Sequence, residues 1–310
     1  MDEYTERTKE HLESRFARTD EGGVYLAHQP IYGFRRGHTE GSALRKYTIT
    51  FQVMRALSHL RFETLVDVGG AEGYKAALAR EIFGADVKNC DLSGEACKRA
   101  TEIFGIDGEP VDVQNLPFED GQFDVALCSQ TLEHVPDVER ATRELIRISS
   151  KATVITVPHQ PRKPIERNIR EGTPHGHVHS MDLRSFDFAL SEVSRIVARR
   201  IVSGLLRIPR ALVDADAGRR ARSYPRLFSD AYSVLVPLMR KVLDERAASA
   251  LMLADGVMCE LVPVYDAMLF ILLKDESCYS GRSAMAVSPR LIIDFAAPLH
   301  YLGGRRGRVS

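Results

Sequence analysis

The stretch LVDVGGAEG, residues 65–73, is an apolar run that contains an acid and passes directly into glycine. In an alternating α/β domain, a strand followed by a Gly-rich turn and a helix directs backbone N–H groups and the positive end of a helix dipole at one point. A ligand can approach at that point. The stretch therefore predicts a ligand site at the end of a strand, although the turn alone does not identify the ligand.

Strand and helix patterns alternate on both sides of this turn. Apolar residues at helical spacing predict a helix over 42–60 that leads into a strand at 64–68. Beyond the turn we expect helices at 74–83, 94–104 and 138–148 and strands at 86–90, 109–113, 123–129, 152–157 and 265–274. Alternation of this kind with short turns predicts a parallel sheet covered by helices on both faces.

The pattern is less regular after residue 158. Pro, Arg and His residues predict a loop at 160–176, and Asp182 is a suitable N-cap for a helix at 182–189. Between 196 and 263 the sequence predicts a strand-like piece, an Arg-rich connection and helical segments. We expect this enlarged region to shape part of a substrate pocket.

Composition limits the class of protein. The chain has 310 residues, 44% hydrophobic and 27% charged, which is enough to bury a sizeable core. Its formal net charge is zero, so we expect no DNA partner. The five cysteines form no C-x-x-C pair, the N-terminus lacks the apolar core of a signal peptide, and no apolar run approaches the roughly 20 residues that span a bilayer. These features predict a cytoplasmic protein without a transmembrane segment.

The residues missing from the turn narrow the choice of ligand. A dinucleotide fingerprint that starts at Gly69 would need glycine where Ala71 and Tyr74 stand, and the Gly-Lys-Ser/Thr of a P-loop is absent. Acids occupy two successive strand ends instead, at Asp67 and Asp91. Acids repel phosphates but suit an ammonium, a sulfonium and the hydroxyls of a ribose. S-adenosylmethionine carries all of these groups.

Three successive segments resemble the motifs of the class I S-adenosylmethionine-dependent methyltransferases. They are VDVGGAEG at 66–73, NCDLS at 89–93 and DVQNLPFEDGQFDVALCSQTLEHVPD at 112–137. The resemblance covers roughly residues 65–190, and the order of the motifs is far more specific than a single Gly turn. It implies an α/β, Rossmann-like, doubly wound and mostly parallel seven-stranded sheet with an N-terminal helical cap and an insertion before the last strand.

The resemblance also implies a division of the chain. Residues 1–60 would form an N-terminal cap or lid and the helix that leads into the first strand. Residues 61–275 would form the methyltransferase domain, with the enlarged substrate-side region at 196–263. Residues 276–310 would be a C-terminal extension.

The same match implies which residues hold the cofactor. They lie at the ends of successive strands and would contact the methionine part, the ribose and the adenine: Asp67, Gly69, Gly70 and Gly73 around the methionine part, Asp91 at the ribose hydroxyls with Leu92 against the adenine, Asp112 at the adenine amino group with Val113 beside it, and Ser129 on the floor of the site. Ala71 stands where many members have glycine. We expect a small cost there, because alanine keeps its backbone N–H.

Methyl transfer is an in-line displacement at a carbon that the sulfonium already activates. The protein mainly has to position a nucleophile and, for a hydroxyl, to accept its proton. Histidines that follow the fourth and fifth strands are the candidates for a general base: His134, His159, His177 and His179.

Two interpretations are open for the residues around Glu133. In one, Glu133 and His134 bind a divalent metal together with His177 or His179, which resembles the Glu-x-x-Glu-His and His-x-His elements of metal-assisted small-RNA 2′-O-methyltransferases. In the other, Leu-Glu-His-Val-Pro is a common helix start of small-molecule methyltransferases. We favour the metal-free interpretation, because Gln130 stands where the first glutamate of the metal pattern would be.

Three flanking features also have two interpretations each. The segment 25–38 is either a lid over the site or a surface arm. The arginines between 195 and 226 either receive an anionic group or lie on solvated helices. The final GRRGR is more typical of a disordered chain end than of a site.

The sequence thus predicts an S-adenosylmethionine-dependent methyltransferase that methylates O, N or C of a small-molecule acceptor such as a natural product, a lipid precursor or a quinone-like compound. One alternative is a metal-assisted RNA 2′-O-methyltransferase, against which the neutral charge argues. Others are a non-catalytic protein that binds S-adenosylmethionine and an enzyme that uses it for different chemistry. A homodimer is also left open.

Overall fold

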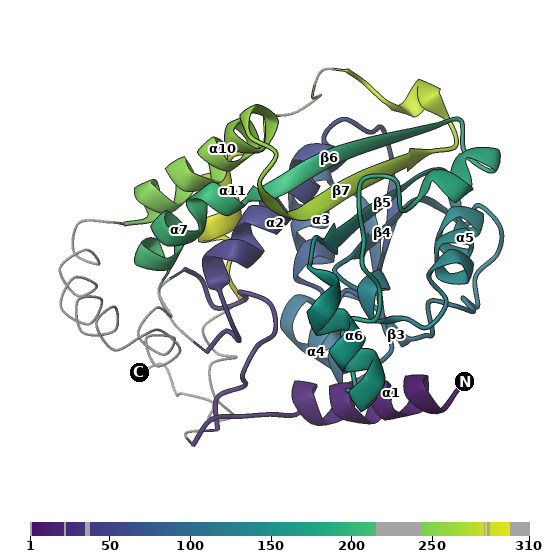
Figure 1. Cartoon of the computed structure of the whole chain (residues 1–310), viewed down its shortest axis with the longest axis horizontal. Helices are drawn as coiled ribbons and strands as arrows, with labels where there is room; N and C mark the ends of the chain where they lie inside the picture. Colours follow the sequence, from purple (N-terminus) through teal and green to yellow (C-terminus); the bar gives the residue numbers. More distant parts are fainter. Residues whose placement is uncertain are drawn as a thin grey trace.

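A seven-stranded sheet in the order β3-β2-β1-β4-β5-β7-β6 runs through the centre of the molecule (Figure 1). The computed structural model describes residues 2–21, 23–34, 38–214, 244–281, 283 and 286–297. Strands β1 to β5 are parallel, whereas β7 is antiparallel to both of its neighbours. The strands span Thr64–Val68 (β1), Asp86–Asp91 (β2), Gly108–Pro110 (β3), Phe123–Ser129 (β4), Ser149–Pro158 (β5), Arg195–Ser203 (β6) and Tyr265–Leu273 (β7). The predicted Rossmann-like sheet is confirmed.

Helices cover both faces of this sheet. The α-helices are Glu3–Phe16 (α1), Ala43–Leu57 (α2), Tyr74–Phe83 (α3), Gly94–Phe104 (α4), Val138–Ile148 (α5), Arg162–Glu171 (α6), Arg207–Val213 (α7), Glu245–Leu261 (α10) and Pro289–Asp294 (α11). Short 3-10 helices are Leu132–His134 (η1), Asp187–Ser191 (η2), Gly204–Leu206 (η3) and Glu276–Cys278 (η5). None of the helices in the described ranges is long and apolar enough to cross a membrane.

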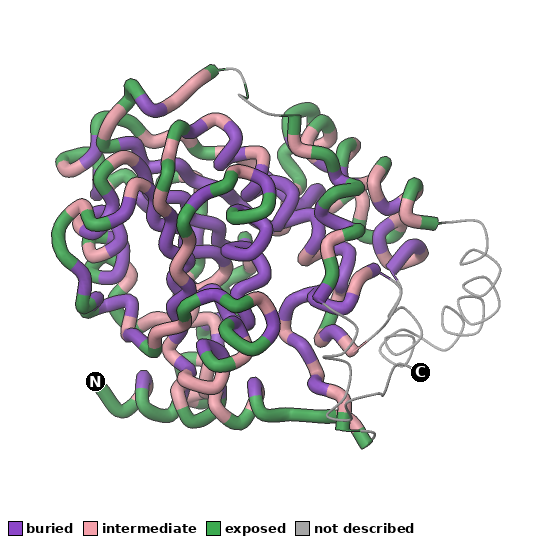
Figure 2. Tube along the Cα trace, turned by 180° about the vertical axis from the view of Figure 1, so that it is seen from behind, coloured by how far each residue is buried: buried purple, intermediate pink, exposed green. Residues whose placement is uncertain are grey.

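The two faces of the sheet bury separate hydrophobic cores, because side chains alternate along each strand. Leu65 of β1 packs with the core formed by α2, α3 and α10, whereas Val66 packs with the core under α5. Buried residues fill the centre of the molecule in Figure 2. All five cysteines are buried and form no disulfide.

The motif-bearing half of the chain matches the sequence prediction closely. Strands β1 and β4 and helices α3, α4 and α5 have the expected bounds. Strand β3 is shorter than expected and ends at Pro110, which has no N–H for the sheet ladder. The regular part of the fold was therefore predictable almost to the residue.

Two predictions after residue 158 are wrong. The expected loop at 160–176 contains helix α6, whose Pro164 lies in the first turn, where a missing N–H costs little, and whose end is capped by Gly172 in a left-handed conformation. The expected helix at 182–189 is a turn followed by η2. There the Asp182 side chain accepts hydrogen bonds from Arg184 N and Ser185 Oγ instead of capping an α-helix.

The insertion before the last strand lies between β6 and β7 and contains η3, α7 and α10. A buried carboxylate, Asp255 of α10, accepts hydrogen bonds from the backbone N–H groups of Val202 and Ser203 at 2.9 and 2.7 Å. It also pairs with Arg210 of α7 at 3.0 Å. Val202 has a φ of 61°, which is unusual for a β-branched residue. Asp255 thus fixes the end of β6 against the insertion.

Part of the predicted Arg-rich connection lies outside the described residues, namely Arg219, Arg220, Arg222 and Arg226, and so does the final GRRGR. Within the described part, Arg207 and Arg210 form ion pairs with Asp266 and Asp255.

The first helix, α1, lies apart from the sheet and packs on α4 (Figure 1). Its Leu12 and Phe16 are buried. The Glu13 carboxylate accepts hydrogen bonds from the backbone N–H groups of Gly94 and Glu95 at the start of α4, at 2.8 and 2.9 Å. A carboxylate at a helix N-terminus is favourable because it satisfies free N–H groups and the helix dipole. This contact holds α1 over the carboxyl ends of the strands.

Candidate functional site

The glycine turn lies at the carboxyl end of β1, where the strand order reverses between β1 and β4. Gly69 and Gly73 have φ values of 77° and 75°, which favour glycine. A side chain on Gly69 would collide with Thr131, and a side chain on Gly70 would collide with Asn89. At Gly73 a Cβ would lie 2.9 Å from Ala100 of α4. The glycines are therefore needed for the shape and packing of the turn.

Ala71 is the exception in this turn. It also adopts a left-handed conformation, with a φ of 50°, where a non-glycine residue costs about 1–2 kcal/mol. The expectation that alanine is inexpensive here is therefore wrong, although Ala71 keeps its N–H as expected. That N–H donates to Asp91 Oδ2 at 2.9 Å.

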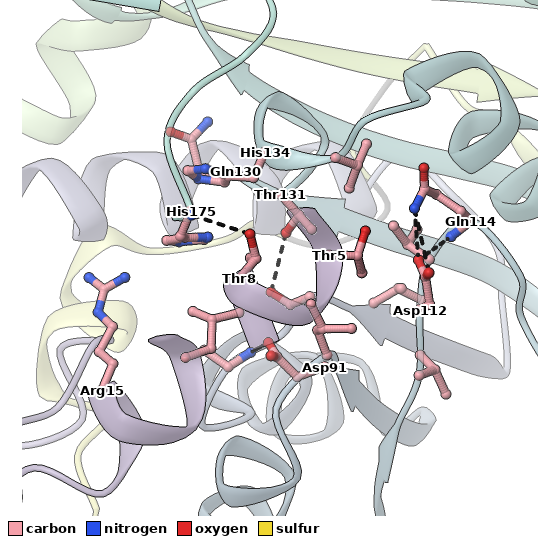
Figure 3. A pocket seen from close by; sticks show the side chains of 18 of the residues that line it. Thr5, Thr8, Arg15, Asp91, Asp112, Gln114, Gln130, Thr131, His134 and His175 are labelled. Carbon is pink, nitrogen blue, oxygen red and sulfur yellow. Dashed lines mark hydrogen bonds between the residues drawn. The ribbon is translucent and has the colours of Figure 1, made fainter. Parts of the chain in front are cut away.

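A cavity extends from the turn along the ends of β1 and β2 and under α1 (Figure 3). Of the nine residues predicted to hold the cofactor, five line it: Gly69, Asp91, Leu92, Asp112 and Val113. Asp67, Gly70 and Gly73 lie outside this lining, and Ser129 lines a neighbouring cavity.

Residues from the N-terminal segment complete the lining, and of these only His28 lies in the segment 25–38 for which a lid was considered. They are Tyr4, Thr5, Thr8, Leu12, Arg15 and Phe16 of α1 and His28 of the following segment. The amphipathic pattern of α1 predicts a buried face, but only the capping contact of Glu13 with α4 decides what that face covers.

Two buried acids lie around the turn. Asp91 Oδ1 accepts a hydrogen bond from Ser93 N at 3.0 Å, and Asp91 Oδ2 accepts one from Ala71 N. Burial raises the pKa of Asp91 to about 6. Asp67 is fully buried, both of its oxygens lack a hydrogen-bond partner among the described residues, and burial raises its pKa to about 6 as well, even though Lys75 nearby favours the charged form. Both acids are thus poised to gain from a cationic ligand.

The far end of the cavity is arranged for a planar polar group. Asp112 accepts hydrogen bonds from the backbone N–H of Gln114 at 2.9 Å and from its side-chain amide at 3.3 Å (Figure 3). Leu92, Val111 and Val113 provide apolar walls beside it. Acids at one end and an apolar slot with an acceptor at the other fit the amino acid, ribose and adenine parts of S-adenosylmethionine.

A second cavity of about 650 Å³ adjoins the first. The two share a wall that includes Gly69, Gln130 and His134. The second cavity is rich in cationic side chains, and its charged lining residues are Arg15, Arg45, Lys46, Lys75, Arg207, Glu133 and Asp266. A ligand in this cavity would therefore lie beside a ligand in the first.

Three of the four predicted base candidates line the second cavity: His134, His159 and His177. His179 does not line it, and its Nε2 contacts the carbonyl oxygen of Val135 at 2.7 Å. His175, which stands with His177 and His179 in the segment PHGHVHS at 174–180, lines both cavities.

These histidines form a cluster. The rings of His134 and His175 stack with centroids 3.7 Å apart, and the His177 ring lies 4.6 Å from His134. Burial holds the pKa of His134 and of His177 below the ordinary value and lowers that of His175 to about 3. Without a ligand, the three rings are therefore neutral near pH 7.

Glu133 lies beside this cluster and is also buried. Its Oε2 has no hydrogen-bond partner among the described residues, and burial raises its pKa to about 8. Ligand atoms of Glu133, His134 and His177 all lie within 4.8 Å of one another. The structure thus brings together three of the four residues that the metal interpretation named and leaves out His179.

The segment after α1 packs into the core, which excludes the surface-arm interpretation for its described part. Tyr25, Ile31 and Phe34 are buried. Buried Glu72 of the glycine turn accepts hydrogen bonds from the hydroxyl of Tyr25 at 2.8 Å and from the backbone N–H of His28. The segment is therefore tied to the turn, while residues 35–37 lie outside the described part of the chain.

Comparison with known proteins agrees with this geometry. Residues 66–155 match the family described as "Methyltransferase domain". Norajmaline N-methyltransferase of Rauvolfia serpentina is 32% identical over 31% of this chain and 35% of its own length. Tocopherol O-methyltransferase, chloroplastic, of Arabidopsis thaliana is 29% identical over 29% of this chain and 28% of its own. For 2-phytyl-1,4-naphtoquinone methyltransferase of Nostoc punctiforme the values are 34%, 33% and 43%.

The chain thus spans 28–43% of the length of these curated relatives. A structure of geranyl diphosphate C-methyltransferase from Streptomyces coelicolor A3(2), in complex with Mg²⁺, geranyl diphosphate and S-adenosyl-L-homocysteine, has a TM-score of 0.50 at 19% identity and covers 88% of this chain and 98% of its own. At that identity the likeness concerns the fold alone.

The motif order, the reversal of strand order between β1 and β4 and the acids at the strand ends are features of the Rossmann-like fold of class I methyltransferases. Residues 66–155 match the methyltransferase-domain family, and the curated relatives that share this part of the chain are named as methyltransferases.

Proposed function

We propose that the protein transfers a methyl group from S-adenosylmethionine to a small-molecule acceptor. The observation that carries the proposal is the shared wall of Gly69, Gln130 and His134 between an acid-lined cavity and a larger polar one. In-line transfer needs the methyl donor and the acceptor atom to meet, and the two cavities adjoin at these residues. The names of the relatives mark them as N- and O-methyltransferases of small molecules, which supports the acceptor class.

The first cavity would hold the cofactor. In this proposal Asp91 takes the ribose hydroxyls, Asp112 accepts from the adenine amino group, and Leu92 and Val113 contact the adenine faces. Gly69 lies at the methionine part, and the buried charge of Asp67 favours the cationic groups from beneath the turn. Helix α1 covers the bound cofactor and keeps water from the sulfonium.

The second cavity would hold the acceptor. Of its charged lining residues, five are cationic and two are acids, and one of these acids, Asp266, already pairs with Arg207. This balance favours an acceptor with an anionic group, such as a carboxylate or phosphate. The helical and 3-10 insertion between β6 and β7 forms part of this wall through Arg207.

A proton released by an acceptor hydroxyl would pass to a histidine. His159 Nδ1 lies 3.1 Å from the carbonyl oxygen of Met181. A carbonyl can only accept, so Nδ1 carries the hydrogen and Nε2 retains a lone pair. His159 Nε2 is therefore able to accept a proton, even if His134 and His177 bind another ligand.

The test is an assay of S-adenosylhomocysteine formation with a panel of small molecules, with and without anionic groups, and with RNA oligonucleotides. Product from a small anionic acceptor, but from neither RNA nor the buffer control, is the expected result. Cofactor binding without turnover on any acceptor would favour the non-catalytic alternative. Turnover on RNA would favour the 2′-O-methyltransferase alternative and would contradict the small-molecule proposal.

A further inference from the structure

Glu133, His134 and His177 converge on one point of the second cavity, and all three line it. We propose that they form a binding site for a divalent transition-metal ion. His134 Nε2 lies 3.9 Å from Glu133 Oε1, and ligand atoms around a cation with bonds of about 2.1 Å are separated by about 3.0–3.4 Å. The three groups therefore need to move by less than about 1 Å to share an ion.

One oxygen of the carboxylate has no partner in the described structure. Glu133 is 1% exposed, and its Oε2 has no hydrogen-bond partner among the described residues. A buried polar atom without a partner is costly, and such atoms commonly mark an absent ion or water. A cation between the carboxylate and the two imidazoles would satisfy this oxygen.

Both histidines are held in the tautomer that a metal ligand needs. His134 Nδ1 lies 3.2 Å from the carbonyl oxygen of Gly176, and His177 Nδ1 lies 2.7 Å from Gln160 Oε1. Because these oxygens can only accept, each Nδ1 carries the hydrogen and each Nε2 has a free lone pair. An oxygen acceptor behind the ring is the usual arrangement for histidines that bind metals.

The segment that carries His177 is fixed against η1, which carries the other two ligands. The backbone N–H of Val178 donates to the carbonyl oxygen of Glu133 at 2.8 Å. Asn168 of α6 donates to the carbonyl oxygen of His177 at 3.1 Å. The site therefore exists before any ion binds, although its residues are distant in sequence.

The ligand set and the surrounding charges select the kind of ion. Two imidazoles and one carboxylate with open positions suit Zn²⁺, Mn²⁺, Fe²⁺ or Co²⁺, whereas Ca²⁺ and Mg²⁺ prefer several oxygen ligands. Arg15 and Arg45 also line the cavity and disfavour an ion held mainly by charge. The open positions face the acceptor cavity, so an anionic acceptor oxygen has access to the ion; this last consequence rests on the proposed function.

The experiment uses the full chain after treatment with a chelator. Co²⁺ is titrated while its visible absorption is recorded, and bound Zn²⁺ is counted by equilibrium dialysis. We expect one ion per chain, with a Co²⁺ spectrum typical of nitrogen and oxygen ligands. Glu133→Gln and His177→Asn should each weaken binding at least about tenfold, whereas His179→Asn, in the same motif but outside the cluster, should bind like the parent protein.

S-adenosylmethionine binding by each variant, measured by calorimetry, controls for folding. Absence of a bound ion in parent protein that binds the cofactor would overturn the proposal, and so would equal affinities in parent, Glu133→Gln and His177→Asn proteins. The two proposals fail separately: methyl transfer by metal-free protein would leave the proposed function standing, and an ion bound by the cluster without any transfer would leave the metal site standing.

Discussion

The two adjoining cavities differ in charge. The first cavity, proposed to hold the cofactor, is a narrow slot with apolar walls that has Asp91 and Asp112 in its lining, and Asp67 is buried beneath the turn beside it. The acceptor cavity is wider and is lined mainly by Arg, Lys and His. The difference suits a reaction in which a cationic donor meets an electron-rich acceptor, because each ligand is attracted to its own side of the shared wall.

The two sides are also stabilised differently. Hydrogen bonds between the turn and the end of β2 hold the cofactor side, whereas one buried ion pair between α7 and α10 holds the insertion on the acceptor side. Substitutions on the two sides should therefore have separable effects on stability and on cofactor binding.

The largest expected effect is on the stability of the acceptor side. Asp255→Ala removes the 3.0 Å partner of buried Arg210, which keeps only a longer pair with Asp266 at 3.5 Å, and it leaves two backbone N–H groups without an acceptor. We expect a loss of about 3–5 kcal/mol in the free energy of unfolding. Urea unfolding measures this loss. The control is Asp187→Ala, which removes an exposed pair with Arg184 and should cost under about 1 kcal/mol. Similar losses in both variants would contradict the assigned role of Asp255.

On the cofactor side, Asp91→Ala should weaken S-adenosylmethionine binding by about 1–3 kcal/mol. The substitution removes the proposed contact with the ribose. It also removes the carboxylate oxygen to which the N–H of Ala71 donates a hydrogen bond. Calorimetry measures the affinity, and Asp107→Ala is the control, because the Asp107 side chain is mostly exposed and is not part of the cavity lining. An unchanged affinity in Asp91→Ala would remove Asp91 from the site.

The charge difference between the cavities also predicts a pH dependence. Burial raises the pKa of Asp91 and of Asp67 to about 6, so both acids take up protons as the pH falls below 6 and lose their attraction for a cation. His28, His134 and His175 also line the cavity, but burial lowers their pKa values, so they stay neutral in this window.

We therefore expect the affinity for S-adenosylmethionine to fall between pH 7 and pH 5, by up to about tenfold per pH unit for each proton. S-adenosylhomocysteine lacks the sulfonium charge, and its affinity should fall less over the same range. A flat profile for both ligands would mean that the two acids carry no charge-dependent contact with the cofactor.

The smallest expected effect concerns the turn itself. Ala71→Gly removes the steric cost of a left-handed conformation and should therefore raise the free energy of unfolding. The rise should be at most about 1 kcal/mol, because the greater freedom of glycine in the unfolded chain offsets part of this stabilisation. Ala79→Gly in the interior of α3 is the control and should be destabilising by about 1 kcal/mol. Destabilisation by both variants would show that the φ of Ala71 carries no strain.

How far the sequence predicts the molecule also differs between the two sides. The bounds of β1, α3 and α4 follow from local signals, since glycines stand at the required turn positions and Ser93 caps α4. On the other side, α6 contains Pro164 and few apolar residues, so its pattern is that of a loop. Ile165 is its one buried residue, so the helix has only a short apolar face to mark it in the sequence.

The same limit applies to the site residues. Asp91 and Asp112 could be placed because they stand at strand ends within ordered motifs. The approach of His177 to Glu133 depends on the hydrogen bond from Val178 to η1, and the cover over the cofactor cavity depends on Glu13 of α1. Both are tertiary contacts between distant segments, which is why the sequence named the histidines without choosing among them.

The most direct test of the account is a calorimetric titration of the full chain with S-adenosylmethionine and S-adenosylhomocysteine, with ATP and NAD as controls. We expect selective binding of the first two ligands in the micromolar range, or about −8 kcal/mol. Equal binding of ATP or NAD, or no binding by folded protein, would contradict the assignment of the acid-lined cavity to S-adenosylmethionine and the proposed function with it.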